Sequence, residues 1–163
     1  MSAIRHGTAP FPVGEVSTGA GNEKLLGLEI QGVDGKEYRL YKSSEVVASP
    51  ATKCFQRSSA GGTSVEMTDD DTTSYCCGVA VADQVALAVG DYFWLQVAGE
   101  VSLTGKSGHG IDAGEFLQPS GGGAEEGLVK TVGAGAVEAQ LPIRATAVAT
   151  NAITALIYYK LWG

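Results

Sequence analysis

The two histidines are the residues best suited to acid–base chemistry near neutral pH. His6 lies close to the start of the chain, and His109 lies in the segment Lys106-Ser107-Gly108-His109-Gly110. A nucleophilic serine needs a histidine base within hydrogen-bond reach, and it often occupies a Gly-x-Ser-x-Gly turn. The sequence contains no such turn, and Ser107 stands only two residues before His109. We therefore expect no catalytic residues and interpret His109 as a loop residue.

Carboxylates occur in two close pairs, Asp112 with Glu115 and Glu125 with Glu126, and in the run 69–71. Glycoside hydrolysis needs two carboxylates about 5–10 Å apart in a cleft. Both pairs lie beside glycines, which favours surface loops instead. A calcium loop needs alternating oxygen ligands with a central glycine, which three adjacent aspartates lack. We expect no metal site and predict that the chain is not an enzyme.

The three cysteines, Cys54, Cys76 and Cys77, form neither a Cys-x-x-Cys motif nor an even set. This pattern predicts buried reduced thiols that pack as small hydrophobic side chains. The segment Gly105-Lys106-Ser107 has no glycine five positions earlier, so it does not match a phosphate-binding loop. We expect no bound cofactor.

The composition excludes several kinds of partner. Charged residues make up only 18% of the 163 residues, 23 are glycines, and the formal net charge is −7. With 11 basic residues scattered among 18 acidic ones, the chain has no patch that could neutralise nucleic-acid phosphates. The apolar tract 145–162 is interrupted by five polar residues, so it predicts no membrane span. Charge and proline in residues 1–13 argue against a signal peptide, which favours synthesis in a cytoplasm.

The pattern of prolines and glycines divides the chain into an N-terminal arm, residues 1–22, and one β-rich domain, residues 23–163. Pro10 and Pro12 favour extended backbone in the arm and exclude it from a central strand. Four apolar residues of the arm are candidates for docking onto a neighbour: Ile4, Phe11, Val13 and Val16.

Short apolar runs separated by glycine turns predict strands in the rest of the chain. Residues 24–42 predict a β-hairpin, because Asp34-Gly35 suits the positive φ of a tight turn. The polar segment 58–73 predicts a surface loop. A two-residue alternation over 143–150 and 153–162 favours strands over the competing alanine-rich helix at 145–157. Other strands are expected at 45–48, 53–57, 75–80, 92–97, 101–104 (after a turn at 98–100), 128–132 and 137–141.

Several consecutive aromatic residues predict contact surface. In a strand Tyr92 and Trp94 point to one face and Phe93 to the other, and Tyr158 and Trp162 also lie in two-sided apolar runs. A strand with two apolar faces needs either two covering layers of its own chain or a partner. Tyr92, Trp94, Tyr158 and Trp162 are therefore interface candidates together with the four arm residues.

Four blocks of the sequence resemble the decoration (cement) proteins of tailed-phage capsids. They are Gly78-Val79-Ala80, Gly90-Asp91-Tyr92, Trp94-Leu95-Gln96-Val97-Ala98-Gly99 and Ala113-Gly114-Glu115-Phe116-Leu117-Gln118-Pro119-Ser120. The resemblance implies an all-β fold, a β-barrel or β-sandwich of the β-tulip kind with an extended N-terminal arm. The family's C-terminal block is represented only by Arg144-Ala145-Thr146-Ala147-Val148, a departure from its usual form.

The resemblance also implies a structural role. The expected protein is a homotrimer at local three-fold axes on the exterior of a bacteriophage capsid, where it bridges and stabilises subunits of the major capsid protein. Two alternatives remain open at this point. One is another virion protein, such as a tail or head-fibre component, and the other is a carbohydrate-binding β-module with an exposed aromatic shelf at Trp94 or Trp162.

Overall fold

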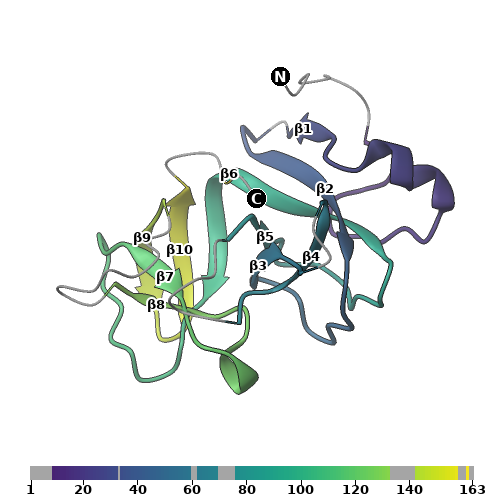
Figure 1. The fold of residues 1–163 in the computed structure, drawn as a ribbon. Coiled ribbons are helices and arrows are strands. Elements are labelled where there is room, and N and C mark those ends of the chain that lie inside the picture. The colour runs from purple at the N-terminus through teal and green to yellow at the C-terminus, as the bar shows by residue number, and fades with distance from the viewer. Residues whose placement is uncertain are drawn as a thin grey trace.

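The computed structural model describes residues 9–32, 34–59, 62–69, 76–132, 142–157 and 161. The fold is all-β, as the sequence predicts, and the described residues include two short 3-10 helices, η1 (Ala20–Leu25) and η2 (Gly123–Glu125) (Figure 1). The strands are β1 (Glu29–Gln31), β2 (Glu37–Ser43), β3 (Cys54–Arg57), β4 (Ser64–Met67), β5 (Gly78–Ala80), β6 (Tyr92–Thr104), β7 (Leu117–Pro119), β8 (Val129–Thr131), β9 (Ile143–Ala149) and β10 (Ala152–Ile157).

Strand β6 connects the two halves of the molecule (Figure 1). Eight strands join in one sheet in the order β1-β2-β4-β3-β5-β6-β10-β9, and β7 pairs with β8 in a second sheet. The first part of β6 pairs with β2 and β5, and its last six residues pair with β10. Because β2 pairs with β6 as well as with β1 and β4, the large sheet folds over itself.

The continuity of β6 corrects the turn predicted at residues 98–100. The chain bends at Gly99, which has a φ of +91°, and continues as the same strand. A Cβ at this position would lie 3.3 Å from the Cα of Lys36, so the close approach of the residue just before β2 also favours glycine. The pairing of β2 with β6 shifts register between Glu37 and Tyr38, which places a bulge beside the bend.

Three other local predictions change. The hairpin at 24–42 forms from β1 and β2, but its first strand is shorter than predicted because residues up to Leu25 form η1. The segment 58–73 contains β4, whose Val65 is fully buried, so it is not a loop throughout. The strand expected at 45–48 is reduced to one bridge, between Val47 and Leu87. The strand predicted at 137–141 lies outside the described residues.

The C-terminal alternation forms strands, as predicted, and no helix. Strands β9 and β10 are antiparallel, with a register shift between Thr154 and Ala155. Ile143 and Ala145 of β9 and Ile153, Ala155 and Ile157 of β10 are buried on one face. The two-residue turn contains Thr150 at a φ of +56°, a conformation that a β-branched residue rarely adopts.

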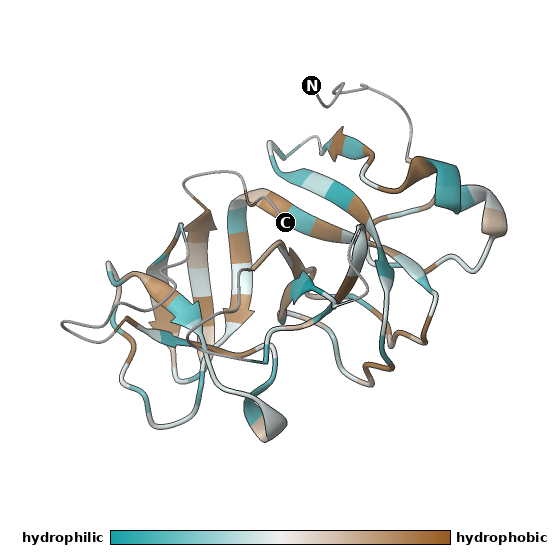
Figure 2. Ribbon diagram, viewed as in Figure 1, coloured by the Kyte–Doolittle hydropathy of each residue, from teal (hydrophilic) through white to brown (hydrophobic). Residues whose placement is uncertain are grey.

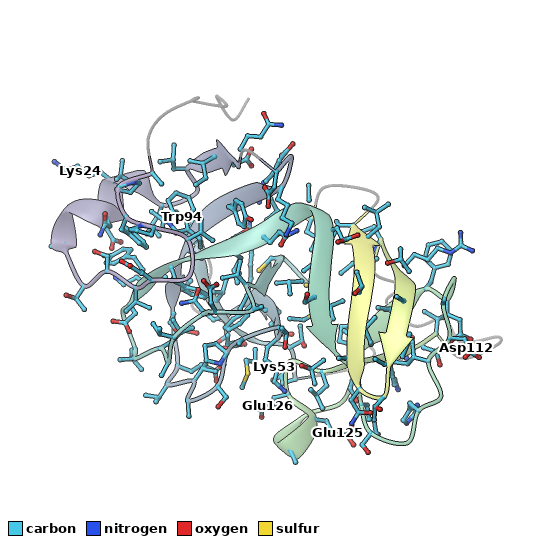
Figure 3. The ribbon with its side chains drawn as sticks, turned by 180° about the vertical axis from the view of Figure 1, so that it is seen from behind. Lys24, Lys53, Trp94, Asp112, Glu125 and Glu126 are labelled. Carbon is cyan, nitrogen blue, oxygen red and sulfur yellow. The ribbon has the colours of Figure 1, made fainter. Side chains whose placement is uncertain are left out.

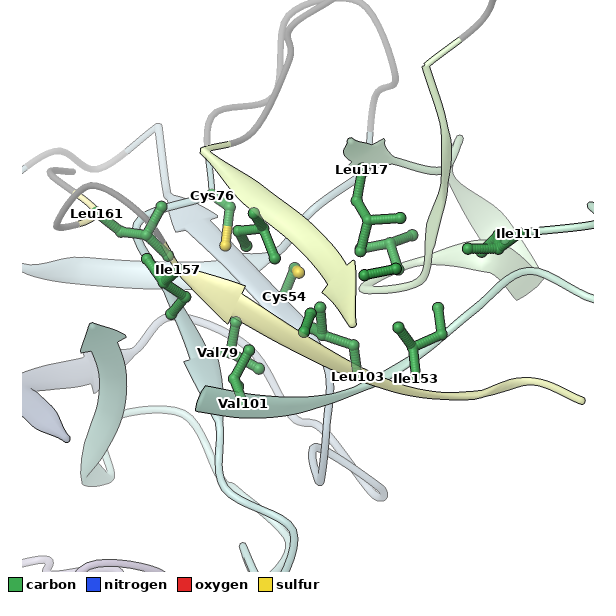
Figure 4. Close-up of a cluster of buried hydrophobic side chains, with 14 of the residues drawn as sticks. Cys54, Cys76, Val79, Val101, Leu103, Ile111, Leu117, Ile153, Ile157 and Leu161 are labelled. Carbon is green, nitrogen blue, oxygen red and sulfur yellow. The ribbon is translucent and has the colours of Figure 1, made fainter. Parts of the chain in front are cut away.

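The apolar side chains gather in three clusters, which lie along β6 and its neighbours. We call the first cluster the sandwich core, and it lies between β6, β9, β10 and the β7–β8 sheet (Figure 4). Figure 2 shows the hydrophobic stretches of these strands. The central core comprises Tyr41, Val47, Phe55, Val65, Cys77, Ala80, Leu87, Phe93 and Leu95. The arm core comprises Tyr38, Leu40, Tyr92 and Trp94, with partly buried residues of the N-terminal segment packed against it.

Candidate interface surfaces

The side chains suited to chemistry serve local structure in the described part of the chain. Glu125 accepts a hydrogen bond from Ser120 Oγ at 2.7 Å and pairs with Lys106 Nζ at 2.8 Å. Both contacts lower the pKa of Glu125, and the contact with Lys106 has the larger effect. Glu115 accepts a hydrogen bond from the Asp112 amide at 2.8 Å. Asp112 lies on a different loop from Glu125 and Glu126 (Figure 3).

No metal or catalytic cluster is found among the described residues. They include no group of three or more His, Cys, Asp or Glu side chains that could hold a metal ion. His109 is exposed on its loop, while His6 and residues 70–71 of the aspartate run lie outside the described residues. None of the described helices is long and apolar enough to cross a membrane.

The three cysteines are free and buried, which confirms their predicted packing role. Cys76 donates a hydrogen bond to Gly78 O at 3.1 Å, and Cys77 donates one to Phe55 O at 3.2 Å. The hydrogen bond with Cys76, together with burial, raises the pKa of Cys54 well above its usual range. Burial likewise raises the pKa of Cys77. The thiolate is the reactive form, so these two thiols are inert in the folded chain.

The interface candidates of the arm pack on the chain's own sheet wherever they are described. Phe11 stacks against Trp94 with ring centroids 5.7 Å apart, and Trp94 Nε1 donates a hydrogen bond to Phe11 O at 3.1 Å. Val13 packs on the same arm core, and Val16 packs against the central core. Trp94 is therefore 0% exposed in a single chain (labelled in Figure 3). Ile4, Tyr158 and Trp162 lie outside the described residues.

Tyr92 and η1 hold this segment in place. Ser17 and Tyr92 exchange two backbone hydrogen bonds of 2.9 Å. The Tyr92 hydroxyl donates to the carboxylate of Glu23 on η1, and Lys42 Nζ lies 3.1 Å from the same oxygen. The hydrogen bond from Tyr92, followed by that from Lys42, lowers the pKa of Glu23. We call Glu23, Lys42 and Tyr92 the arm latch.

Two hollows mark the surface of the described residues. One, of about 450 Å³, lies over β6, β9 and β10 and is lined by small uncharged side chains such as Ala147, Ala152 and Thr154. The other, of about 310 Å³, is lined by polar residues including Lys36, Tyr38 and Asp83. Burial, reinforced by the charges of Asp34 and Asp83, raises the pKa of Tyr38 to about 12.

The structure also exposes apolar residues that the sequence prediction missed. Val46, Val85 and Val89 are 72%, 49% and 65% exposed. They lie on two loops together with exposed alanines, and we call the set the loop-tip patch: Val46, Ala48, Val85, Ala86, Ala88 and Val89. One sequence signal could have revealed the loop-tip patch. Residues 85–89 are all apolar and lie between Asp83 and Asp91.

The arrangement defines an all-β protein whose described surface includes an uncharged hollow over β6, β9 and β10 and an exposed apolar patch on two loops. No protein-family model matches the chain, and neither does any curated protein. Among the solved structures that share its fold are two from bacteriophages. One is a chain from the capsid of Myoviridae Phage XM1, with a TM-score of 0.62 and 10% identity, and the match covers 99% of this chain and 98% of that one.

The second structure is the N base of the head fiber protein gp8.5 from bacteriophage phi29. Its TM-score is 0.51 at 15% identity, and the match covers 77% of this chain and 97% of that one. Identities this low establish a common fold alone. The present chain therefore has a fold that occurs in two phage head components.

Proposed function

We propose that the chain is a structural protein of a bacteriophage virion, which binds the outer surface of the assembled capsid and stabilises it. The observation that carries the proposal is the end-to-end fold similarity to a chain of the XM1 capsid, over 99% of this chain. The low content of charge and the exposed apolar residues support a role in protein contacts. The net charge of −7 favours the exterior, because an acidic protein is repelled by packaged DNA.

In this proposal the chain decorates the capsid as a trimer at local three-fold axes and bridges subunits of the major capsid protein. It is made in the host cytoplasm and joins the capsid after the shell has assembled. Ile4, Tyr158 and Trp162 stay candidates for these contacts on the sequence argument. Trp94 and the described arm residues contribute instead to the chain's own core, which leaves Trp94 no surface for a partner.

A head-fibre component is the second candidate, and the similarity to the phi29 head fiber base favours it specifically. A carbohydrate-binding module is less well supported, because its aromatic shelf was expected at Trp94 or Trp162. Trp94 is 0% exposed and cannot provide such a shelf.

The test uses purified particles of the virus whose genome encodes the chain. Mass spectrometry should find the chain in stoichiometric amounts, and cryo-electron microscopy should place it outside the shell at three-fold axes. Light scattering should give the mass of a trimer in solution. Density for a fibre projecting outward from the chain would favour the head-fibre role, and absence of the chain from purified particles would contradict both.

A further inference from the structure

The loop-tip patch is built from two short segments that pair as a miniature ladder. Val47 and Leu87 exchange two backbone hydrogen bonds of 2.9 Å, and both side chains are 2% exposed, in the central core. Neighbouring residues of an extended segment point to opposite sides. The flanking residues Val46, Ala48, Ala86 and Ala88 therefore share the outer face, and all four are exposed.

Further hydrogen bonds hold both loops rigidly. Ser44 N donates to Val65 O at 2.8 Å, which ties the first loop to β4. In the second loop, the Ala88 amide donates to Asp91 Oδ2 at 2.7 Å, and Gly90 N donates to Ser43 O at 2.8 Å. Val46 cannot turn inward, because its neighbour Val47 already occupies the core position. A rigid surface of short β-branched side chains loses little entropy on binding.

The border of the patch is acidic. Glu15 follows Gly14, whose carbonyl accepts a hydrogen bond from Val85 N at 3.3 Å, and Asp83 precedes Val85 by two residues. Both acids are exposed. Glu45 precedes Val46, and its carboxylate accepts a hydrogen bond from Met67 N at 2.6 Å. The two loop segments, 44–51 and 81–91, contain no Lys or Arg.

An apolar centre with a charged border is the usual composition of a protein–protein contact. We propose that the loop-tip patch docks on a capsid-shell protein whose matching surface is an apolar hollow bordered by Lys or Arg side chains. A second copy of this chain fits poorly, since it would bring an identical acidic border against the first. The inference rests on the proposed function and adds the contact surface and the chemistry of its partner.

The test measures binding of the purified full-length chain to heads made from a genome that lacks its reading frame. The double variant Val46→Glu/Val89→Glu should bind about tenfold more weakly or worse, because it places a carboxylate at an exposed apolar position on each of the two loops. Asp83→Asn with Glu15→Gln should weaken the dependence of binding on NaCl between about 50 mM and 500 mM. The matched control Ala152→Glu adds a charge to the exposed face of β10 and should bind as the wild type does.

The possible results distinguish a failure of the docking inference from a failure of the proposed function. Thermal unfolding should show that all variants fold, since the altered side chains are exposed. If the wild-type chain binds heads and the double valine variant binds equally well, the loop-tip patch is not the docking surface, although the proposed function stands. If the wild-type chain does not bind heads, the proposed function itself fails. If the valine variant only dissociates an oligomer of this chain, the patch joins copies and the inference is overturned.

Discussion

Arg39 and Glu29 form an ion pair across β1 and β2 that is almost fully shielded from water. Their side chains are 7% and 4% exposed, and Arg39 Nη1 also donates to the Tyr41 hydroxyl at 3.1 Å. Removing one partner from a buried pair leaves an unpaired charge, which costs about 3–5 kcal/mol. The pair therefore selects this register of β1 against β2 over alternatives that would separate the two charges.

Gly78 shows how closely strands approach at a single residue. It lies on β5 beside β6, and a Cβ placed there would be 2.5 Å from the Cβ of Leu95. Real Cβ atoms do not approach so closely, and Leu95 is itself fully buried. The glycine is needed for packing between strands, since its φ is not positive.

We expect Gly78→Ala to lower the free energy of unfolding by about 1–3 kcal/mol, because the added methyl group overpacks the contact between β5 and β6. Urea denaturation followed by circular dichroism measures this change. Gly121→Ala is the matched control, because a Cβ at Gly121 meets no atom within 4 Å. An equal loss in both variants would show that the contact with Leu95 is not the cause.

At the scale of elements, the arm latch joins η1 to β2 and β6. Glu23 is the acceptor for both Tyr92 and Lys42, and its pKa lies below its usual value of 4.5. A lowered pKa in the folded state means that the charged carboxylate favours folding. Its contribution is present above the unfolded pKa and is lost as the pH falls through the folded pKa. The contribution of Glu23 to holding η1 against β2 and β6 should therefore weaken as the pH falls through its folded pKa.

The variant Tyr92→Phe should raise the pKa of Glu23 towards 4.5, because it removes the hydrogen bond that stabilises the carboxylate most. A carboxyl titration by NMR measures this shift directly. Lys24→Met changes the next residue of η1 but leaves both hydrogen bonds in place, so the pKa of Glu23 should stay where it is. An unchanged pKa in Tyr92→Phe would refute the latch.

In the molecule as a whole, the single strand β6 belongs to both halves of the fold. The first part of β6 contributes Phe93 and Leu95 to the central core and Trp94 to the arm core, and the second part contributes Val101 and Leu103 to the sandwich core. Unfolding of either half removes the pairing partner of the other. The N-terminal segment completes this body by covering Trp94.

Removing residues 1–19 should therefore destabilise the folded chain as a whole, since it uncovers Trp94 and Leu40. We expect a loss of about 2 kcal/mol or more in the free energy of unfolding, from the lost burial of apolar area. Tryptophan fluorescence should shift to longer wavelength. A chain shortened by residues 1–8 keeps Phe11 and serves as the control. Full stability after removal of residues 1–19 would show that the packing of Phe11 is dispensable.

The class of fold can be predicted from the amino-acid sequence alone, because strand periodicity and turn chemistry are local properties. The alternation over β9 and β10, the hairpin at Asp34-Gly35 and the packing role of the cysteines could all be predicted from neighbouring residues. The continuity of β6 could not be predicted. Gly99 resembles a turn residue until the close approach of Lys36, more than sixty positions away, is known.

Only the tertiary structure decided which apolar surfaces remain exposed. Alternation shows that a strand has two faces but does not show what covers each face. Trp94 is an interface candidate by its sequence and is covered by the chain's own Phe11. Val46 resembles a core valine, yet it stays exposed because the neighbouring Val47 fills the core position. Burial depends on contacts between distant segments, and a local pattern does not contain that information.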